Sequence, residues 1–416
     1  MSRAATNLQI DSTRLWGAIH ETAQFGATAK GGVRRLTLGP EDKQVRDWFR
    51  NACEAAGLEV HVDALGTIFG LRKGRDMSKL PVGIGSHLDT QPTGGKYDGI
   101  LGTLGALEVI RTLNDAGIET EAPICVVNWT NEEGSRFVPV MMGSGVFCGA
   151  FGLDHAYAAR DAGGRSVREE LARIGYLGSE VPGCHPVACY FEAHIEQGPV
   201  LEDAATVIGV VDGALGARWY DCTVTGTEAH AGSTPMTSRR DALAVATQVM
   251  QEVVALGNRH PPHGRGTVGY VDVFPNSRNV IPGRVRFSID LRNASAGLLD
   301  AMDGEIRAFV DRTRNESGLA IDVQQVAHYA PCPFDAGCIE IVERAAGRLG
   351  ESHMHVTSGA GHDAIHVARV APTSMIFVPC KDGISHNEVE DADPSHVEAG
   401  ASVLLHCMLE KAGVVR

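Results

Sequence analysis

Residues 85–99, GSHLDTQPTGGKYDG, constrain the fold of this chain more than any other stretch. A short apolar run leads into them, as expected of a strand that ends in a loop. Residues two apart on a strand share a face, so His87 and Asp89 can aim at one point. The Gly94-Gly95 pair allows a tight reversal at little steric cost, which could return Asp98 to the same place. An imidazole and carboxylates that converge in this way predict a site for a divalent metal ion.

Length and charge narrow the classes of protein. A chain of 416 residues exceeds what one core usually supports, so we expect two domains. The net charge of -14 argues against nucleic acid or an anionic membrane as a partner. No apolar run is long enough to cross a bilayer, and the first 16 residues lack the features of a secretory signal. Ten scattered cysteines without a C-x-x-C pair fit free thiols, so we predict a cytoplasmic protein.

Helix-like and strand-like segments alternate over the first 130 residues and again after residue 331. Apolar residues at helical spacing predict helices over residues 11–25, 40–56, 99–116 and 395–411. Short apolar runs predict strands over residues 58–62, 66–71, 80–85, 123–129, 189–193 and 373–378. This alternation is typical of βαβ units with a mostly parallel sheet, and ligands bind such sheets at the carboxyl ends of the strands.

The pattern changes between residues 213 and 329. Strands are expected over residues 217–224, 267–274, 284–291 and 319–327, with helices over residues 239–256 and 298–313. The order β-α-β-β-α-β is that of a ferredoxin-like domain. We therefore predict an α/β catalytic domain of residues 1–212 and 330–416, with a mixed, mostly parallel sheet. Residues 213–329 would form an inserted ferredoxin-like α+β lid domain.

Histidines and carboxylates follow the predicted strands in four separate stretches. They are His87, Asp89 and Asp98; Glu132 and Glu133; His194 and Glu196; and His386, Glu388 and Glu390. Each stretch alone is more often an ordinary packed or solvated group. At one sheet edge, however, this set suits a divalent ion such as Zn, Mn, Co or Ni. It has enough carboxylates for two ions about 3.5–4 Å apart, as in hydrolytic two-metal sites.

Two further features of the sequence can be interpreted from the residues alone. Neighbouring side chains on an extended segment point apart, so one of Glu132 and Glu133 could bind metal while the other faces an attacking water. A second group of histidines lacks an acidic ligand set apart from Asp363, so we interpret it as structural. Its members are His353, His355, His362 and His366.

The combined motifs closely resemble the M20 metallopeptidase-like amidase family, in particular its hydantoinase/carbamoylase group of N-carbamoyl-L-amino acid amidohydrolases and β-ureidopropionases. The resemblance covers nearly the whole chain. Besides residues 85–99, it rests on NWTNEEGSRF (128–137), FEAHIEQGPVLE (191–202), GTEAHAGSTPM (226–236), FPNSRNVIPG (274–283), DLRN (290–293), SGAGHDA (358–364) and SHNEVE (385–390).

The resemblance implies a zinc-peptidase-like centre with two divalent metal ions per subunit. Its ligands would be His87, Asp98, Glu133, His194 and His386. Asp98 would bridge the ions, while His87 and His194 would each hold one. Asp89 would orient His87 through its other ring nitrogen. Glu132 would be the general base and acid.

The remaining implied residues would contact the substrate. His230 would stabilise the oxyanion and Arg292 would anchor a carboxylate. Without the resemblance, His230 would be interpreted as a capping or core-edge histidine and Arg292 as a surface arginine at a strand end. Further contacts would come from Gln197, Asn279, and the backbone N–H groups of Gly359, Ala360 and Gly361. Closure of the lid, with hinges near Gly213 and Pro331, would bring His230 and Arg292 to the metals.

The implied activity is hydrolysis of the carbamoyl group of N-carbamoyl-L-amino acids, which yields the amino acid, ammonia and carbon dioxide. The substrate would be a small ureido compound with a carboxylate, and the enzyme a homodimer joined through the lid domain. Whether His230 serves its own or the partner's site stays open. Alternatives are N-carbamoyl-β-alanine or allantoate as substrate, a dipeptidase, against which His194 argues, or a non-catalytic binding protein, which would lack ligands.

Overall fold

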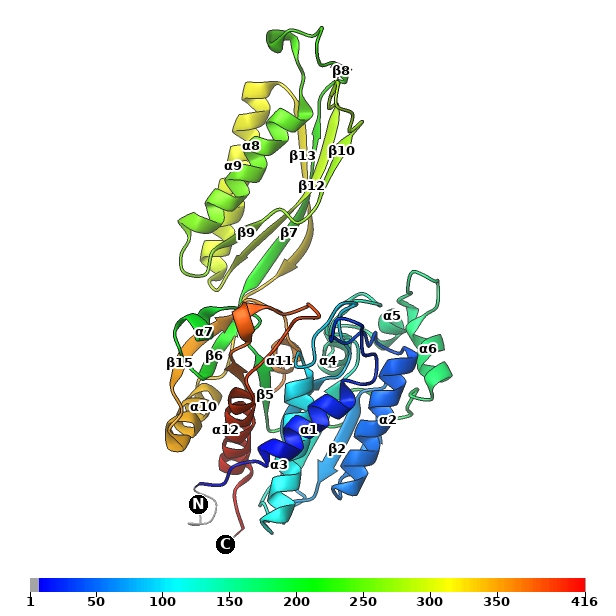
Figure 1. The fold of residues 1–416 in the computed structure, drawn as a ribbon, viewed down its shortest axis with the longest axis vertical. Coiled ribbons are helices and arrows are strands. Elements are labelled where there is room, and N and C mark those ends of the chain that lie inside the picture. Colours follow the sequence, from blue (N-terminus) through cyan, green and yellow to red (C-terminus); the bar gives the residue numbers. More distant parts are fainter. Residues whose placement is uncertain (1–6, 416) are drawn as a thin grey trace. The chain divides into compact units, whose positions relative to one another are not determined.

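The chain divides into two compact units in the computed structural model, which describes residues 7–415 (Figure 1). Residues 1–6, which belong to the segment predicted to lack a secretory signal, lie outside this range. Unit 1 comprises the chain up to residue 212 and from residue 334 onward, and unit 2 comprises residues 213–333. The second change of unit falls four residues later than the predicted boundary at 329/330. Within the described range, no helix has the length and apolar character needed to cross a membrane.

Unit 1 is built on a mixed sheet in the order β1-β2-β4-β3-β5-β16-β6, with β15 beside β6; the two-residue strand β14, at the end of unit 2, extends this nine-stranded sheet by pairing with Gly213 and Ala214 at the end of β6. The strands are β1 (Glu59–Val62), β2 (Ile68–Arg72), β3 (Val82–His87), β4 (Ile124–Trp129), β5 (Cys189–Ile195), β6 (Ile208–Ala214), β14 (Cys332–Pro333), β15 (His353–Ser358) and β16 (Thr373–Val378). The central strands β4, β3, β5 and β16 run parallel. All four are fully buried, because helices cover both faces of a largely parallel sheet.

Ten helices of unit 1 surround this sheet within the described range. They are α1 (Ser12–Thr22), α2 (Pro40–Ala55), α3 (Ile100–Asp115), α4 (Met142–Phe147), α5 (Leu153–Ala158), α6 (Val167–Ile174), α7 (Val200–Asp203), α10 (Ala336–Leu349), α11 (Asp363–Val367) and α12 (Pro394–Ala412). The most deeply buried are α3 and α12, which pack against each other and against β3 and β5. Leu104, Leu107 and Leu404 are among the apolar side chains that fill this core.

Unit 2 has its own sheet and core. Its elements are β7 (Gly216–Thr225), β8 (Ala229–His230), α8 (Ala242–Arg259), β9 (Arg265–Thr267), β10 (Val271–Phe274), β11 (Val280–Ile281), β12 (Arg284–Asn293), α9 (Ala296–Ser317) and β13 (Ala320–Tyr329). The antiparallel order is β10-β12-β7-β13, with β9 also beside β12. Because β9 ends at Thr267 and β10 begins at Val271, the strand predicted over residues 267–274 is interrupted. Helices α8 and α9 pack together on this sheet around Tyr220, Val249, Phe287 and Ile306.

The mixed, mostly parallel α/β sheet and the β-α-β-β-α-β order of the inserted segment confirm the predicted fold class. Strands β3, β4, β5 and β16 occur where apolar runs predicted them. Pro40 begins α2 and Pro394 begins α12, which suits a residue whose missing N–H has no partner at a helix start. Gly117 follows α3 with a φ of 59°, as expected of a helix stop.

Candidate active site

The proposed site residues gather at the carboxyl ends of the central parallel strands. His87 is the last residue of β3, His194 is the next to last of β5, and Glu132 follows the end of β4 by three residues. Because β4, β3 and β5 are neighbours in register, their ends meet at one edge of the sheet. His386 lies in the loop after β16, which pairs with β5.

One group consists of His87, Asp98 and His194, all buried. The Nε2 atoms of His87 and His194 lie 3.5 and 3.2 Å from the same oxygen, Oδ1 of Asp98. The expectation that these histidines hold different ions is not what the geometry favours. Since they end adjacent parallel strands, both rings face one carboxylate oxygen.

A second group consists of Asp98, Glu133 and His386. Nε2 of His386 lies 3.3 Å from Oδ2 of Asp98 and 3.5 Å from Oε2 of Glu133. Each oxygen of Asp98 therefore faces a different group of donors. This is the arrangement expected of a carboxylate that bridges two ions.

Three of the four distances within these groups are longer than usual hydrogen bonds, and the fourth, from His194 to Asp98, is 3.2 Å. N–H···O hydrogen bonds usually span about 2.7–3.2 Å. Two ligands each about 2.1 Å from a tetrahedral ion lie about 3.4 Å apart, close to the distances found here. Nδ1 of His87 lies 3.0 Å from the carbonyl of Asp89, and Nδ1 of His194 lies 2.8 Å from that of Ile195. A carbonyl only accepts, so Nδ1 carries the proton and the Nε2 lone pair faces Asp98. Neutral rings oriented in this way offer Nε2 lone pairs to a cation that the Asp98 oxygen would also bind, so the residues fit a metal centre; the N–H of Gly99 also lies 3.1 Å from Nε2 of His194.

Asp89 acts differently from the expectation. Its backbone carbonyl, not its carboxylate, is the partner of His87 Nδ1, since carboxylate Oδ1 lies 3.8 Å away. The carboxylate instead accepts the hydroxyl of Thr37 at 2.5 Å and the backbone N–H groups of Glu132 and Glu133 at 3.3 Å each. Asp89 therefore holds the turn that carries the two glutamates.

Glu132 is buried beside the first group, with Oε2 3.6 Å from Nε2 of His87. The preceding residue, Asn131, has a φ of 58°, and its amide donates to the carbonyls of Phe137 and Pro139. A non-glycine residue in this region is uncommon and costs about 1–3 kcal/mol, so the surrounding contacts hold a strained turn in place. As a result Glu132 and Glu133 are presented together at the sheet edge.

Burial and charge shift the ionisation of these groups in opposite directions. Burial would raise the pKa of Asp98, but His194, His386 and His87 outweigh it and hold that pKa well below its usual range. Burial raises the pKa of Glu132 well above its usual range. Burial and the negative charge of Asp98 raise the pKa of Glu133 to about 7. The contact with Asp98 raises the pKa of His386 to about 9, against the effect of burial.

The position of the Asp98 carboxylate is fixed from several sides. Nε2 of Gln197 and the hydroxyl of Ser385 donate to its Oδ2 at 2.7 and 2.8 Å. Glu390 accepts the backbone N–H groups of Tyr97 and Asp98 at 3.0 and 3.2 Å. Gln197 was predicted to contact substrate, and here it contacts the carboxylate of Asp98. Gln197 and His386 both have positive φ, at 61° and 55°, which adds to the strain at this edge.

Gly99 is required by the packing of the same loop. Its φ is 72°, and a Cβ atom placed on it would lie 2.3–2.5 Å from the ring of His87. An L side chain would have to displace that ring. The glycine therefore allows the backbone after Asp98 to lie directly against His87.

Other residues at the site were missed or interpreted otherwise from the sequence. The ring of His362 lies 4.6 Å from that of His194, and its Nε2 lies 3.0 Å from the hydroxyl of Ser358. It therefore belongs to this site and not to a separate histidine cluster. Glu192, which is fully buried, groups with His194 and His362. A signal existed for Glu192, since it lies two residues before His194 on the same face of β5.

Several acidic and histidine candidates lie elsewhere. Glu196 accepts the N–H groups of Val200 and Leu201 at the start of α7. Glu388 pairs with Lys30 at 3.5 Å. His353, His355 and His366 join no group of potential metal ligands within residues 7–415.

The loop of residues 359–361 follows β15 and leads to His362. The N–H of Ala360 donates to the hydroxyl of Ser358 at 3.1 Å, so it is already engaged. A Cβ on Gly361 would lie 3.2 Å from the Cε atom of Met141. The N–H of Ala360 is therefore not free for a substrate in this structure, and the expected substrate contacts of Gly359, Ala360 and Gly361 stay a prediction.

In unit 2, His230 and Asn279 lie together. His230 in β8 pairs with Val280 in β11, and the carbonyl of Asn279 accepts the N–H of Ala231 at 2.8 Å. Nδ1 of His230 accepts the N–H groups of Gly232 and Ser233 at 3.1 and 3.2 Å. Neutral His230 therefore carries its proton on Nε2, where it can be donated to a ligand.

Arg292 lies in β12, on the five-stranded sheet of unit 2, whereas His230 lies on the separate two-stranded sheet of β8 and β11. Arg292 pairs with Ala217 near the start of β7, whereas Thr225 at the end of β7 pairs with Arg284. Eight residue steps along a strand span about 26 Å. His230 lies beyond the Thr225 end, and β8 and β9 mark the two ends of unit 2 (Figure 1). One unit 2 therefore cannot bring both His230 and Arg292 to one small molecule, contrary to the expectation from lid closure.

Comparisons with known proteins show the family of this chain. The sequence pattern of peptidase family M20/M25/M40 matches residues 83–410. An N-carbamoyl-L-amino-acid amidohydrolase of Rhizobium meliloti is 47% identical over 415 residues, which is 100% of each chain. An allantoate amidohydrolase of Bacillus subtilis is 32% identical, over 94% of this chain and 95% of the other.

A solved structure is similar over almost the same extent. The amidase of the hydantoinase/carbamoylase family from Burkholderia multivorans superposes with a TM-score of 0.95 at 53% identity, over 97% of this chain and 98% of the other. Residues 83–410, which the family pattern matches, include both groups of potential metal ligands around Asp98 and the whole of unit 2. The chain belongs to peptidase family M20/M25/M40, in its hydantoinase/carbamoylase group of amidases.

Proposed function

We propose that this protein hydrolyses the carbamoyl group of N-carbamoyl-L-amino acids to the amino acid, ammonia and carbon dioxide. It would thus act on carbon–nitrogen bonds other than peptide bonds in linear amides. The relative that is 47% identical over its full length carries that activity in its name. The free state of all ten cysteines supports a reducing compartment, and we propose the cytoplasm.

The observation that carries the proposal is the carboxylate of Asp98. Its two oxygens face two separate donor groups, and the buried carboxylate of Glu132 lies beside them. The family is metal-dependent. His87, Asp98 and His194 would hold one divalent ion, and Asp98, Glu133 and His386 the other, with Zn, Mn, Co or Ni as the candidates. When bound, the ions would supply Lewis acidity toward water and the ureido carbonyl.

Residues of the chain would carry out the proton transfers. Glu132 would accept a proton from the attacking water and return it to the departing ammonia, after which the carbamate loses carbon dioxide. Asp89 would keep Glu132 in place by accepting its backbone N–H. His230 would donate a hydrogen bond from its Nε2–H to the ureido oxygen as negative charge develops there. Gln197 would keep Asp98 oriented and, with Asn279 and residues 359–361, line the substrate site.

We further propose a homodimer in which each site uses two copies of the chain. The strand register separates His230 from Arg292, so a small ureido acid that contacts both requires the two residues to come from different subunits. Arg292 would bind the substrate carboxylate through its planar guanidinium. His230 and Asn279 would come from the partner.

The substrate is tested by a panel assayed on one enzyme preparation. Ammonia release and amino acid formation are measured for N-carbamoyl-L-amino acids, N-carbamoyl-β-alanine, allantoate and a dipeptide. The highest kcat/KM is expected for an N-carbamoyl-L-amino acid. A higher value for allantoate would favour the alternative suggested by the Bacillus subtilis relative. Faster dipeptide cleavage would overturn the amidase assignment.

Glu132 is tested by Glu132→Gln. This substitution removes the base but leaves an isosteric side chain next to His87. Turnover should fall by at least about 10³-fold while the metal content of the purified protein stays at the wild-type value. Substantial activity in this variant would exclude Glu132 as the base.

The shared site is tested by mixing two inactive variants, His230→Ala and Arg292→Ala. After dissociation and reassociation at equal amounts, half the dimers are hybrids, and each hybrid has one site without either substitution. Activity should then return to about a quarter of the wild-type value in a symmetric dimer. No recovery, with hybrids demonstrated by native mass spectrometry, would place both residues in one subunit's site.

A further inference from the structure

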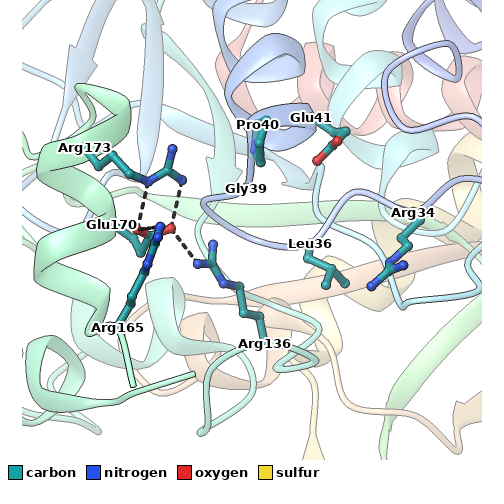
Figure 2. Close-up of a pocket in the computed structure, with 9 residues that line it drawn as sticks. All are labelled: Arg34, Leu36, Gly39, Pro40, Glu41, Arg136, Arg165, Glu170 and Arg173. Atoms are coloured by element: carbon teal, nitrogen blue, oxygen red, sulfur yellow. Dashed lines mark hydrogen bonds and ion pairs between the residues drawn. The ribbon is translucent and has the colours of Figure 1, made fainter. Parts of the chain in front are cut away.

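Unit 1 contains a cavity of about 420 Å³ that the proposed chemistry does not use (Figure 2). Four arginines line it, together with two glutamates and the first turn of α2. The lining residues are Arg34, Leu36, Gly39, Pro40, Glu41, Arg136, Arg165, Glu170 and Arg173. A cavity with this many guanidinium groups is unusual in a chain whose net charge is -14.

Glu170 cannot neutralise these arginines by itself. Its side chain is 2% exposed, and its two oxygens accept from Arg136 at 2.5 Å, from Arg173 at 2.8 Å and from Arg165 at 3.3 Å. Figure 2 shows the three arginines gathered around it. Arg136 is additionally paired with Asp161 at 2.8 Å. The lining therefore keeps an excess of positive charge.

Several donors remain for a ligand. A guanidinium has five N–H groups. The side chain of Arg34 makes no hydrogen bond or ion pair within residues 7–415, and it is exposed. Arg165, 63% exposed, uses only Nη1 in its pairing with Glu170. The first turn of α2 also lines the cavity, and the N-terminus of a helix carries partial positive charge.

The cavity is connected to the turn of Glu132 and Glu133. Arg136 lies three residues after Glu133, and its Nη1 donates to the carbonyl of Thr37 at 3.0 Å. The hydroxyl of Thr37 donates to Asp89, which accepts the N–H groups of both glutamates. Three successive hydrogen bonds, by way of Thr37 and Asp89, therefore link Arg136 to the proposed base Glu132.

We propose that this cavity, called here the arginine pocket, binds a small oxyanion of the phosphate or carboxylate class. Arg34 and Arg165 supply the donors that the fold leaves unused, because guanidinium forks match the oxygens of either group. Occupancy acts on the turnover of the proposed enzyme through Arg136, Thr37 and Asp89. This second part rests on the proposed function, whereas binding does not.

Binding is tested first, on the metal-loaded enzyme, by calorimetric titration with inorganic phosphate and separately with succinate. The wild type is compared with the double variant Arg34→Ala/Arg165→Ala and with Arg50→Ala, an exposed α2 arginine paired with Glu54. Binding of an anion at the metal centre would contribute equally to the titrations of all three proteins. We expect one additional site in the wild type and in Arg50→Ala, weakened at least tenfold in the double variant. Equal titrations in all three proteins would overturn the site.

The position of the anion is tested by crystals grown with selenate, whose anomalous signal should lie in the arginine pocket. A signal at the metals alone would contradict the arginine pocket. For the coupling, kcat is measured with and without the better of the two anions. It should change at least twofold in the wild type and not in the double variant. Binding without any change in kcat would overturn the proposed coupling but not the proposed binding site. A wild-type protein without activity would contradict the proposed function only.

Discussion

The hydroxyl of Thr37 donates a 2.5 Å hydrogen bond to the carboxylate of Asp89, 52 residues further along the chain. Asp89 then accepts the backbone N–H groups of Glu132 and Glu133. The proposed base and one proposed metal ligand thus depend on a buried threonine outside every motif that identified the family. This relationship can be tested separately from the metal centre.

Thr37→Val should lower kcat about tenfold, equivalent to about 1.4 kcal/mol, because the Asp89 carboxylate loses one of its three donors. Steady-state kinetics and metal analysis are the measurements. KM and metal content should change little, since neither substrate nor metal is contacted. Thr37→Ser retains the hydroxyl and should restore most of the activity. If the serine variant were as slow as the valine variant, packing and not the hydrogen bond would explain the effect.

Gly99→Ala should destabilise the protein by about 1–3 kcal/mol and reduce its metal content, because the added methyl group overlaps the ring of His87. Thermal unfolding and metal analysis measure the two effects. Gly117→Ala is the matched control, since Gly117 also has positive φ but has no atom within 4 Å of an added Cβ. Similar losses in both variants would attribute the effect to backbone strain alone.

Removal of metal by a chelator should abolish activity and lower the melting temperature. The carboxylates of Asp98 and Glu133 lie 3.3 and 3.5 Å from Nε2 of His386, so a bound cation would attract all three groups and stabilise the folded chain. Ligands that bind only the folded state stabilise it by mass action, so the melting temperature should rise again on titration with Zn, Mn, Co or Ni. Activity that survives at undetectable metal content would refute the two-metal centre.

Glu170→Gln should destabilise the protein at neutral pH and much less in acid. Hydrogen bonds from Arg173 and Arg136 outweigh burial and lower the pKa of Glu170 to about 2. Because this folded-state pKa lies below the unfolded one, the carboxylate stabilises the fold above about pH 4.5, by about 2 kcal/mol after allowance for its exposed partners. That contribution is lost as the pH falls toward 2. The difference in melting temperature between wild type and variant should therefore narrow between pH 7 and pH 3.5; a constant difference would contradict it.

Much of the fold could be predicted because its signals are local. Apolar runs mark β3, β4, β5 and β16 in the sequence, and their parallel arrangement brings His87, Glu132 and His194 to one edge. The prediction of a metal site there follows from residue types and strand ends alone. Helix α2 was predicted to within a residue because Pro40 and Gly57 flank it.

Contacts between distant segments were less accessible. Strand order decides that His87 and His194 share one oxygen of Asp98, and strand order is not written in local periodicity. Thr37 carries no pattern that marks it as a partner of Asp89. The exchange of roles between the carbonyl and the carboxylate of Asp89 depends on less than 1 Å, which spacing in the sequence cannot resolve.

The register of β7 against β12 has a consequence for how this protein would behave in dilute solution. If Arg292 and His230 must meet one substrate from opposite ends of two sheets, an isolated chain holds only half of the contacts that the reaction needs. Specific activity would then decline on dilution with the fraction of paired chains, even while each chain stays folded and loaded with metal. The association constant of the subunits, and not only the chemistry of the metal centre, would set the lowest protein concentration at which the substrate is turned over.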